Sequence, residues 1–218
     1  MYLLEKYRAS LARRLASASA TGEDSRPSVV TSVNDTASNG MDHRIARCDW
    51  MRNMEPQLDL NDDDRRFLTR SVDLAREALA AGDEPFGSVL VDADGRELFA
   101  DRNRVAGGDH TRHPEFEIAR RAAEHLTPEQ RAESVVFTSG EHCPMCSAAH
   151  AWVGLGRIVY ASRSQQVSAW HKDWGLAPGP VLPLRVQDVA PGIEVAGPDP
   201  ELSSQVRNLH ARLHGVDA

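Results

Sequence analysis

From Asn61 onward, segments with helical periodicity alternate with short runs of β-forming residues, and this alternation limits the possible folds more than any other feature. The stretch "NDDDRR" offers capping and acidic side chains at a helix start, and apolar residues follow at helical spacing until Gly82. A turn signal at 93–95 separates the two predicted strands of a hairpin. The alternation predicts an α/β fold. The other predicted elements are strands at 88–91, through 98–99, at 135–138 and at 157–160, and helices through 118–126 and from Pro144.

The region after residue 160 is predicted to hold two short strands and a closing helix. The stretches "LPLRV" (182–186) and "IEVAG" (193–197) contain the alternating apolar residues that are typical of strands. Asp199 and Pro200 suit the start of a helix, and leucine and valine follow them at helical spacing.

The composition predicts one folded domain behind a long extension. The chain has 218 residues, of which 41% are hydrophobic, enough for one sizeable core. Residues 1–55 are rich in Ser, Thr, Gly and Asn and have little to bury, so we expect a disordered N-terminal extension. The folded domain is expected at 56–218.

The charge and the apolar runs restrict the partners. A net charge of -7 and a sequence pI near 5.7 disfavour the broad basic surface that binds nucleic acid, so a small-molecule partner is expected. No apolar run approaches the roughly 18 residues that span a bilayer, so no membrane association is expected. We expect a cytoplasmic protein, although leucines and basic residues in the first helical turns also resemble an organelle transit peptide.

Two of the three cysteines, Cys143 and Cys146, form a C-x-x-C pair, which by itself fits a zinc half-site or a redox couple. His113 and Glu115 lie upstream in a His-x-Glu pattern. Zinc in a catalytic site takes three nitrogen or sulfur ligands from the protein and keeps one position open for water. The combination therefore favours a catalytic zinc site.

The prolines place these residues at helix starts. Pro114 and Pro144 each suit the first helical position, where a missing N–H is not needed. His113 and Cys143 would then lie at the N-termini of two helices, whose partial positive charge stabilises thiolates. Two such helices, side by side on one face of a sheet, would bring the ligands to one metal.

Two other readings of the cysteines stay open on the residues alone. A thioredoxin-like redox pair explains the C-x-x-C spacing but leaves His113 and Glu115 without a role. A structural zinc needs a fourth protein ligand, for which His110, His142 or His150 could serve, and it leaves Glu115 idle.

The block from Pro85 to Tyr160 resembles the cytidine deaminase superfamily through "PFGSVLV", "NRV", "HPE" and "SGEHCPMCSAA". Within it, the chain is similar to the bacterial nucleoside deaminase branch, which includes guanine, cytosine and tRNA adenosine deaminases. The resemblance implies a three-layer α/β/α sandwich with a central mixed five-stranded sheet, and a homodimer. It also implies that 56–218 is a zinc-dependent deaminase domain.

The resemblance assigns roles to six residues. It implies that His113, Cys143 and Cys146 bind one Zn²⁺ per chain and that Glu115 is the catalytic proton shuttle rather than a ligand. Zinc lowers the pKa of water towards about 7, which provides the nucleophile for the amine-bearing ring carbon. In the substrate pocket, the resemblance implies that Asn103 hydrogen-bonds the base and that Phe86 lines the wall.

The substrate is expected to be a nucleobase or nucleoside, with guanine and cytosine types first. The acidic balance disfavours the alternative of a tRNA adenosine deaminase, and a non-catalytic protein with a structural zinc is a further alternative. Pro114 stands where relatives commonly have alanine. Because proline has no N–H to donate, we expect recognition of the base to differ from that in the best-known cytidine deaminases.

Overall fold

Asn61 starts the first described helix, α3 (Asp62–Ala80), with a capping box. Its side chain accepts a hydrogen bond from the backbone N–H of Asp64 at 2.8 Å, and the carboxylate of Asp64 accepts one from the backbone N–H of Asn61 at 3.4 Å. This geometry belongs to a computed structural model, which describes residues 60–217. The predicted start of this helix is confirmed.

The central sheet is mixed and five-stranded, as predicted. Its strand order is β2-β1-β3-β4-β5. β1 pairs antiparallel with β2 and β3, whereas β4 pairs parallel with β3 and β5. The strands are β1 (Gly87–Val91), β2 (Glu97–Arg102), β3 (Val135–Gly140), β4 (Arg157–Ser162) and β5 (Val195–Ala196).

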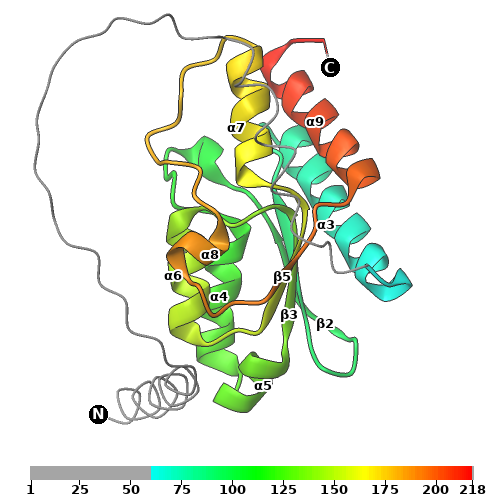
Figure 1. Cartoon of the computed structure of the whole chain (residues 1–218), viewed down its shortest axis with the longest axis vertical. Helices are drawn as coiled ribbons and strands as arrows, with labels where there is room; N and C mark the ends of the chain where they lie inside the picture. Colours follow the sequence, from blue (N-terminus) through cyan, green and yellow to red (C-terminus); the bar gives the residue numbers. More distant parts are fainter. Residues whose placement is uncertain (1–59, 218) are drawn as a thin grey trace, which may run out of the picture. The chain divides into compact units, whose positions relative to one another are not determined.

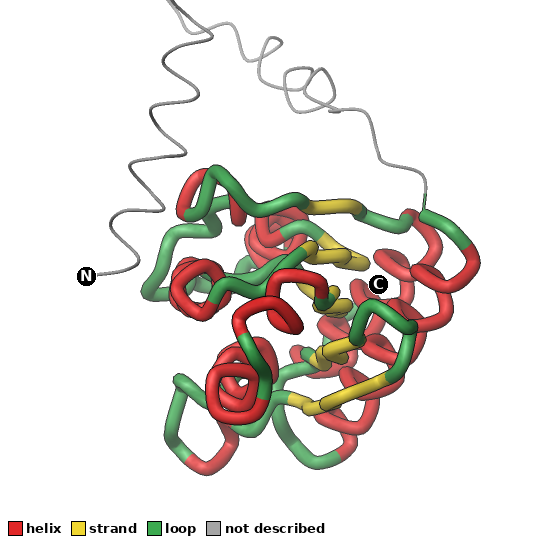
Figure 2. The backbone as a smooth tube through the Cα atoms, turned by 90° about the horizontal axis from the view of Figure 1, so that it is seen from below, coloured by secondary structure: helices red, strands yellow, loops and turns green. Residues whose placement is uncertain are grey.

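Helices cover both faces of the sheet (Figures 1 and 2), so the predicted three-layer sandwich is confirmed. α3 and α9 (Pro200–His214) pack on one face, and α4 (Pro114–His125) and α6 (Pro144–Val153) lie on the other. Successive residues of a strand point to opposite faces, so Val89 and Val91 join the α3 and α9 layer while Leu90 joins the α4 layer.

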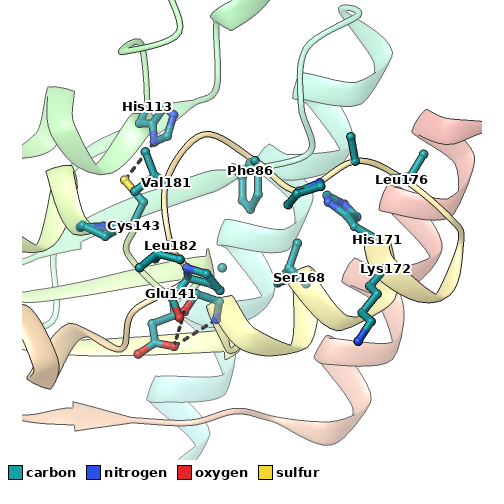
Figure 3. A pocket seen from close by; sticks show the side chains of 18 of the residues that line it. Phe86, His113, Glu141, Cys143, Ser168, His171, Lys172, Leu176, Val181 and Leu182 are labelled. Atoms are coloured by element: carbon teal, nitrogen blue, oxygen red, sulfur yellow. Dashed lines mark hydrogen bonds between the residues drawn. The ribbon is translucent and has the colours of Figure 1, made fainter.

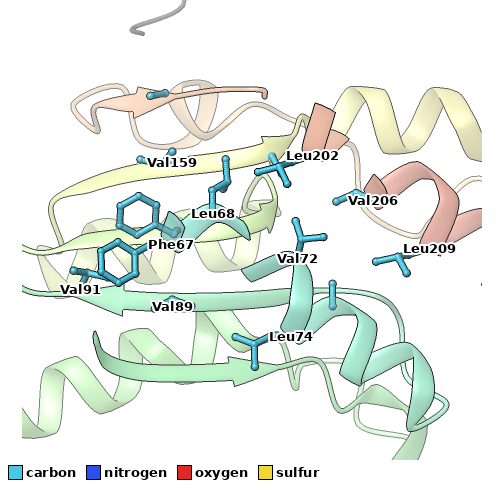
Figure 4. Close-up of a cluster of buried hydrophobic side chains, with 14 residues drawn as sticks. Phe67, Leu68, Val72, Leu74, Val89, Val91, Val159, Leu202, Val206 and Leu209 are labelled. Atoms are coloured by element: carbon cyan, nitrogen blue, oxygen red, sulfur yellow. The ribbon is translucent and has the colours of Figure 1, made fainter. Parts of the chain in front are cut away.

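The larger apolar cluster fixes α3 against the strands (Figure 4). Gly87 at the start of β1 permits this close approach, because a Cβ there would lie 2.4 Å from the Cβ of Leu74 and 2.5 Å from the carbonyl oxygen of Ser71. The side chains that α3 and α9 contribute to this cluster include Phe67, Leu68, Val72, Leu202, Val206 and Leu209.

The prediction of a strand in "LPLRV" was wrong. Residues 182–185 have no regular structure, and Val186 begins a short helix, α8 (Val186–Val189). Pro183 has no N–H for a ladder, and Leu182 and Leu184 are exposed, so these apolar residues do not pack as a strand would. "IEVAG" does contain a strand, β5, which has only two residues.

Besides α8, two described α-helices had no counterpart among the predicted elements. They are α5 (Pro128–Glu133) and α7 (Ser164–Asp173). α5 buries none of its side chains and α7 buries only Val167, so neither has the apolar stripe by which a helix is predicted. A short 3₁₀ helix, η1 (Val105–Gly107), follows β2.

The expected N-terminal extension, residues 1–55, lies outside the described residues, and the domain boundary stays a prediction. Among the helices within 60–217, none is long and apolar enough to cross a membrane.

Candidate metal centre

Two helix starts hold the predicted metal ligands. His113 is the N-cap of α4 and Cys143 is the N-cap of α6, with proline at the first helical position of each. The two helices lie next to each other on one face of the sheet (Figure 1). Cys146 follows Cys143 by three residues, so one helical turn brings both thiols to the same end of α6.

The distances between the ligand atoms fit a zinc ion. Nδ1 of His113 lies 3.6 Å from Sγ of Cys143 and 3.6 Å from Sγ of Cys146. Tetrahedral zinc with Zn–N near 2.05 Å and Zn–S near 2.3 Å separates a nitrogen and a sulfur ligand by about 3.6 Å. Within residues 60–217, no fourth histidine, cysteine or carboxylate joins this group, so these three residues suit an open zinc site.

Hydrogen bonds among the three ligands shift their pKa values in opposite directions. A hydrogen bond to Cys143 raises the pKa of His113 to about 9. Hydrogen bonds from Cys146 and then from His113 lower the pKa of Cys143 to about 4, while the bond to Cys143 and burial raise the pKa of Cys146. At neutral pH a thiolate is therefore already present at Cys143, and zinc binding displaces protons from His113 and Cys146.

The two oxygens of Glu115 have different surroundings. Oε1 lies 2.8 Å from the hydroxyl of Ser88 and 2.9 Å from that of Thr138. Oε2 lies 3.7 Å from Sγ of Cys146. The side chain is buried, and burial raises the pKa of this carboxyl. Glu115 is therefore held beside the ligands, and its carboxyl binds a proton more readily than an exposed glutamate does.

A cavity of about 530 Å³ lies next to this centre (Figure 3). His113, Glu115 and Cys143 line it, and Phe86 also contributes to its wall; contact of Phe86 with a substrate stays a prediction. Gly140 permits the position of Phe86, because a Cβ at Gly140 would lie 2.8 Å from the phenyl ring. The other walls come from α7 and from the loop that follows it, and they include Ser168, His171, Leu176, Val181 and Leu182.

Comparison with known proteins agrees with this geometry. Residues 61–162 match the family described as the cytidine and deoxycytidylate deaminase zinc-binding region. The chain is 29% identical over 146 residues to a probable cytosine deaminase of Schizosaccharomyces pombe. The aligned region covers 64% of this chain and 86% of that protein. It is 38% identical over 98 residues to a guanine deaminase of Bacillus subtilis, at 44% and 62% coverage.

A tRNA-specific adenosine deaminase of Agrobacterium fabrum is 31% identical over 104 residues, which cover 47% of this chain and 68% of the relative. The chain belongs to the cytidine deaminase superfamily. A solved structure of a mutant of the protein NE0047 in complex with 8-azaguanine shares the fold, with a TM-score of 0.55 at 27% identity. It covers 71% of this chain and 85% of the other.

Asn103 is buried in this member of the cytidine deaminase superfamily, but it is not among the residues that line the cavity. Its Oδ1 accepts a hydrogen bond from the backbone N–H of Val105 at 3.0 Å, which fixes the orientation of the amide. Its Nδ2 has no hydrogen-bond partner within the described part of the chain. A buried donor without a partner could bind a ligand oxygen. The hydrogen bond from Asn103 to a base stays a prediction.

Three residues that contribute to the site were not predicted from the sequence, namely Ser88, Thr138 and Glu141. Ser88 and Thr138 hold Oε1 of Glu115, and they do so because β1 and β3 pair with these two residues opposite each other. Glu141 accepts hydrogen bonds from the backbone N–H groups of Ser164 and Val186, each at 3.0 Å. It thereby joins the end of β3 to the starts of α7 and α8, and no local sequence signal indicates such contacts.

The remaining predicted residues have plain structural explanations. Pro114 occupies the first position of α4, so the backbone offers no N–H there. The Nε2 atom of His150 lies 2.9 Å from the carbonyl oxygen of Gly156, which joins the end of α6 to the start of β4. Neither His142 nor His150 belongs to the ligand group in residues 60–217. The alternative of a structural zinc with one of them as fourth ligand is therefore disfavoured.

Proposed function

We propose that this chain is a zinc-dependent hydrolytic deaminase that acts on a small nucleobase or nucleoside, with guanine-type and cytosine-type substrates first. In this reaction, water adds to the ring carbon that carries the amine. The C–N bond to that amine then breaks, and ammonia leaves. The ring keeps the oxygen of the water as a carbonyl group, and one ring nitrogen keeps a proton.

The position of Glu115 is the observation that carries this proposal. Two hydroxyls hold one carboxylate oxygen, and the other oxygen lies 3.7 Å from the sulfur of Cys146, beside the cavity. A zinc ion held by His113 and the cysteines supplies a water molecule that is activated at neutral pH. Oε2 of Glu115, on the side of the metal ligands, would be the oxygen that accepts a proton from such a water.

Glu115 would carry protons in three steps. It accepts one from the attacking water, gives it to the ring nitrogen, and then protonates the departing amine. Burial raises the pKa of this carboxyl, which makes it a better proton acceptor than an exposed glutamate. Ser88 and Thr138 keep the carboxylate oriented throughout, so they act as positioning residues.

The cavity and the relatives support a small substrate. About 530 Å³ is in the usual range for small-molecule sites. Phe86 offers a ring for contact with a flat base. A guanine deaminase is 38% identical to this chain, and the structure with 8-azaguanine shares its fold. We therefore place guanine first and cytosine second.

The decisive experiment measures ammonia release and zinc content together. The full chain would be assayed with guanine, cytosine, adenine and their nucleosides, beside Glu115→Gln. The matched control is Glu117→Gln, because Glu117 lies in the same helical turn but forms a surface ion pair with Arg121 at 3.0 Å. We expect Glu115→Gln to keep its zinc and to lose at least about 1000-fold in rate, whereas the control retains both.

Other results would change the conclusion. Zinc bound without ammonia from any base would favour a non-catalytic zinc protein, and activity only on tRNA would favour the adenosine deaminase alternative. Full activity in Glu115→Gln would overturn the proposed role of this carboxylate.

A further inference from the structure

Three histidines gather at the junction of α7 and α9, outside the candidate zinc centre. His171 comes from α7, and His210 and His214 come from α9. One ring nitrogen from each lies within 4.8 Å of the others. His210 and His214 are four residues apart, so they project from the same face of α9, which is the spacing by which two helical histidines share one metal.

The contact between His171 and His210 has the geometry of two ligands of one metal. Nε2 of His171 lies 3.3 Å from Nδ1 of His210. Tetrahedral zinc with Zn–N bonds near 2.05 Å separates two nitrogen ligands by about 3.3 Å. His214 is exposed at the last position of α9, next to Gly215, so its ring has room to complete the set.

The protein supplies few other partners for these rings. His210 is buried, and its other ring nitrogen, Nε2, which is not the one facing His171, has no hydrogen-bond partner in residues 60–217. No carboxylate belongs to the described group, and the rings otherwise contact aromatic side chains, Phe86, Trp170 and Trp174. Burial lowers the pKa of His210 to about 3 and also lowers that of His171, so both imidazoles are neutral at pH 7, the form that binds metals.

We propose that His171, His210 and His214 form a second metal site, which binds a divalent transition-metal ion such as Zn²⁺ through three imidazoles. Imidazole ligands suit zinc, copper and nickel better than magnesium or calcium. The ion would join α7 to α9. His171 also lines the substrate cavity (Figure 3), so the ion would fix one part of the cavity wall.

This site shares no ligand with the candidate zinc centre, so the two are separable by experiment. The full chain would be equilibrated with micromolar Zn²⁺, freed of excess metal by gel filtration and analysed for metal per chain. We expect about two zinc ions per chain, and about one after His214→Ala. His125→Ala is the matched control, because His125 is also an exposed histidine at a helix end, and it should keep both ions.

Two further variants test the same site independently: one removes another histidine, and one removes a ligand of the candidate zinc centre. His171→Gln removes the ligand from α7 and should also leave about one ion per chain. Cys146→Ser should still bind one ion, and that ion should be lost when His214→Ala is added. This result does not depend on whether the chain is a deaminase. With Co²⁺, thiolate-to-metal absorption should come from the cysteine site alone and should be unchanged by His214→Ala.

Two results would overturn the proposal. One is a single zinc ion per chain in the unmodified protein, which would make the three rings a packing cluster. The other is equal metal content in the unmodified chain, His214→Ala and His171→Gln, each shown by circular dichroism to be folded. In that case the additional ion is bound elsewhere on the surface.

Discussion

The two carboxylate oxygens of Glu115 have different neighbours, which suits them to different roles. Its Oε1 is held by two hydroxyls from adjacent strands, and its Oε2 lies on the side of the metal ligands. Hydrogen bonds to Oε1 keep the carboxylate in one orientation during proton transfer, as a preorganised site requires. The hydroxyl of Thr138 also lies 2.9 Å from the carbonyl oxygen of Gly140, the last residue of β3. Because a hydroxyl has one proton, it donates to only one of these two oxygens at a time.

Thr138→Val tests this positioning role at a single residue. The change keeps the shape of the side chain but removes the hydroxyl beside Oε1 of Glu115. We expect kcat to fall about 10- to 100-fold with zinc content unchanged. A loss of this size is typical when a residue that orients a metal ligand or a catalytic group is removed. Steady-state kinetics and metal analysis of the purified variant provide the measurement.

Two comparisons separate positioning from a general effect on folding. Thr138→Ser should restore most of kcat, because it returns the hydroxyl. Thr69→Val, at an exposed threonine of α3, should change nothing. If Thr138→Ser is as slow as Thr138→Val, the hydroxyl has no positioning role.

At the scale of elements, α3 packs closely on the start of β1, next to Ser88. Gly87 is the point of closest approach, since a Cβ there would meet the Cβ of Leu74 and the backbone of Ser71 and Ala75 at 2.4 to 2.7 Å. Backbone atoms cannot move aside without shifting the helix. The helix and the strand therefore pack at this distance only because residue 87 is glycine.

Gly87→Ala should separate α3 from β1 and lower the free energy of unfolding by at least about 2 kcal/mol, the usual cost of overpacking a core. Chemical denaturation measures the change. Gly107→Ala is the control, because a Cβ at Gly107 meets no atom within 4 Å and its φ lies outside the left-handed region. Equal stability of the two variants would contradict this account of the packing.

At the scale of the whole molecule, buried histidines make stability depend on pH. Burial lowers the pKa of His150 from 6.5 to about 4 and that of His210 from 6.5 to about 3. Between these values and 6.5, the unfolded chain binds protons that the folded chain does not. The free energy of unfolding should therefore fall as pH falls from 6.5 towards 4, by up to about 1.4 kcal/mol per pH unit for each histidine.

Denaturation curves at several pH values, for the unmodified chain and His150→Gln, measure this effect. The variant should show a slope that is smaller by up to about 1.4 kcal/mol per pH unit, because glutamine takes up no proton. Protonation of the zinc ligands contributes equally to both proteins and cancels in the comparison. A slope unaffected by His150→Gln would contradict the prediction.

The sequence by itself determined what depends on near neighbours along the chain. Asn61 and Asp64 start α3, and Cys143 and Cys146 share one helical turn, because these interactions span three residues. The sheet class, the metal ligands and Phe86 in the cavity wall were predicted from such patterns and from the family resemblance. α7 was not predicted, because its mostly polar surface gives no periodic signal.

The tertiary structure alone decided what depends on strand register and helix packing. Ser88 meets Thr138 because two antiparallel strands pair at that register, 50 residues apart in sequence. His171 meets His210 across 39 residues because the tertiary fold brings α7 next to α9. Contacts of this kind form only when distant segments bury apolar surface together, and local sequence patterns contain no information about which residues that burial will align.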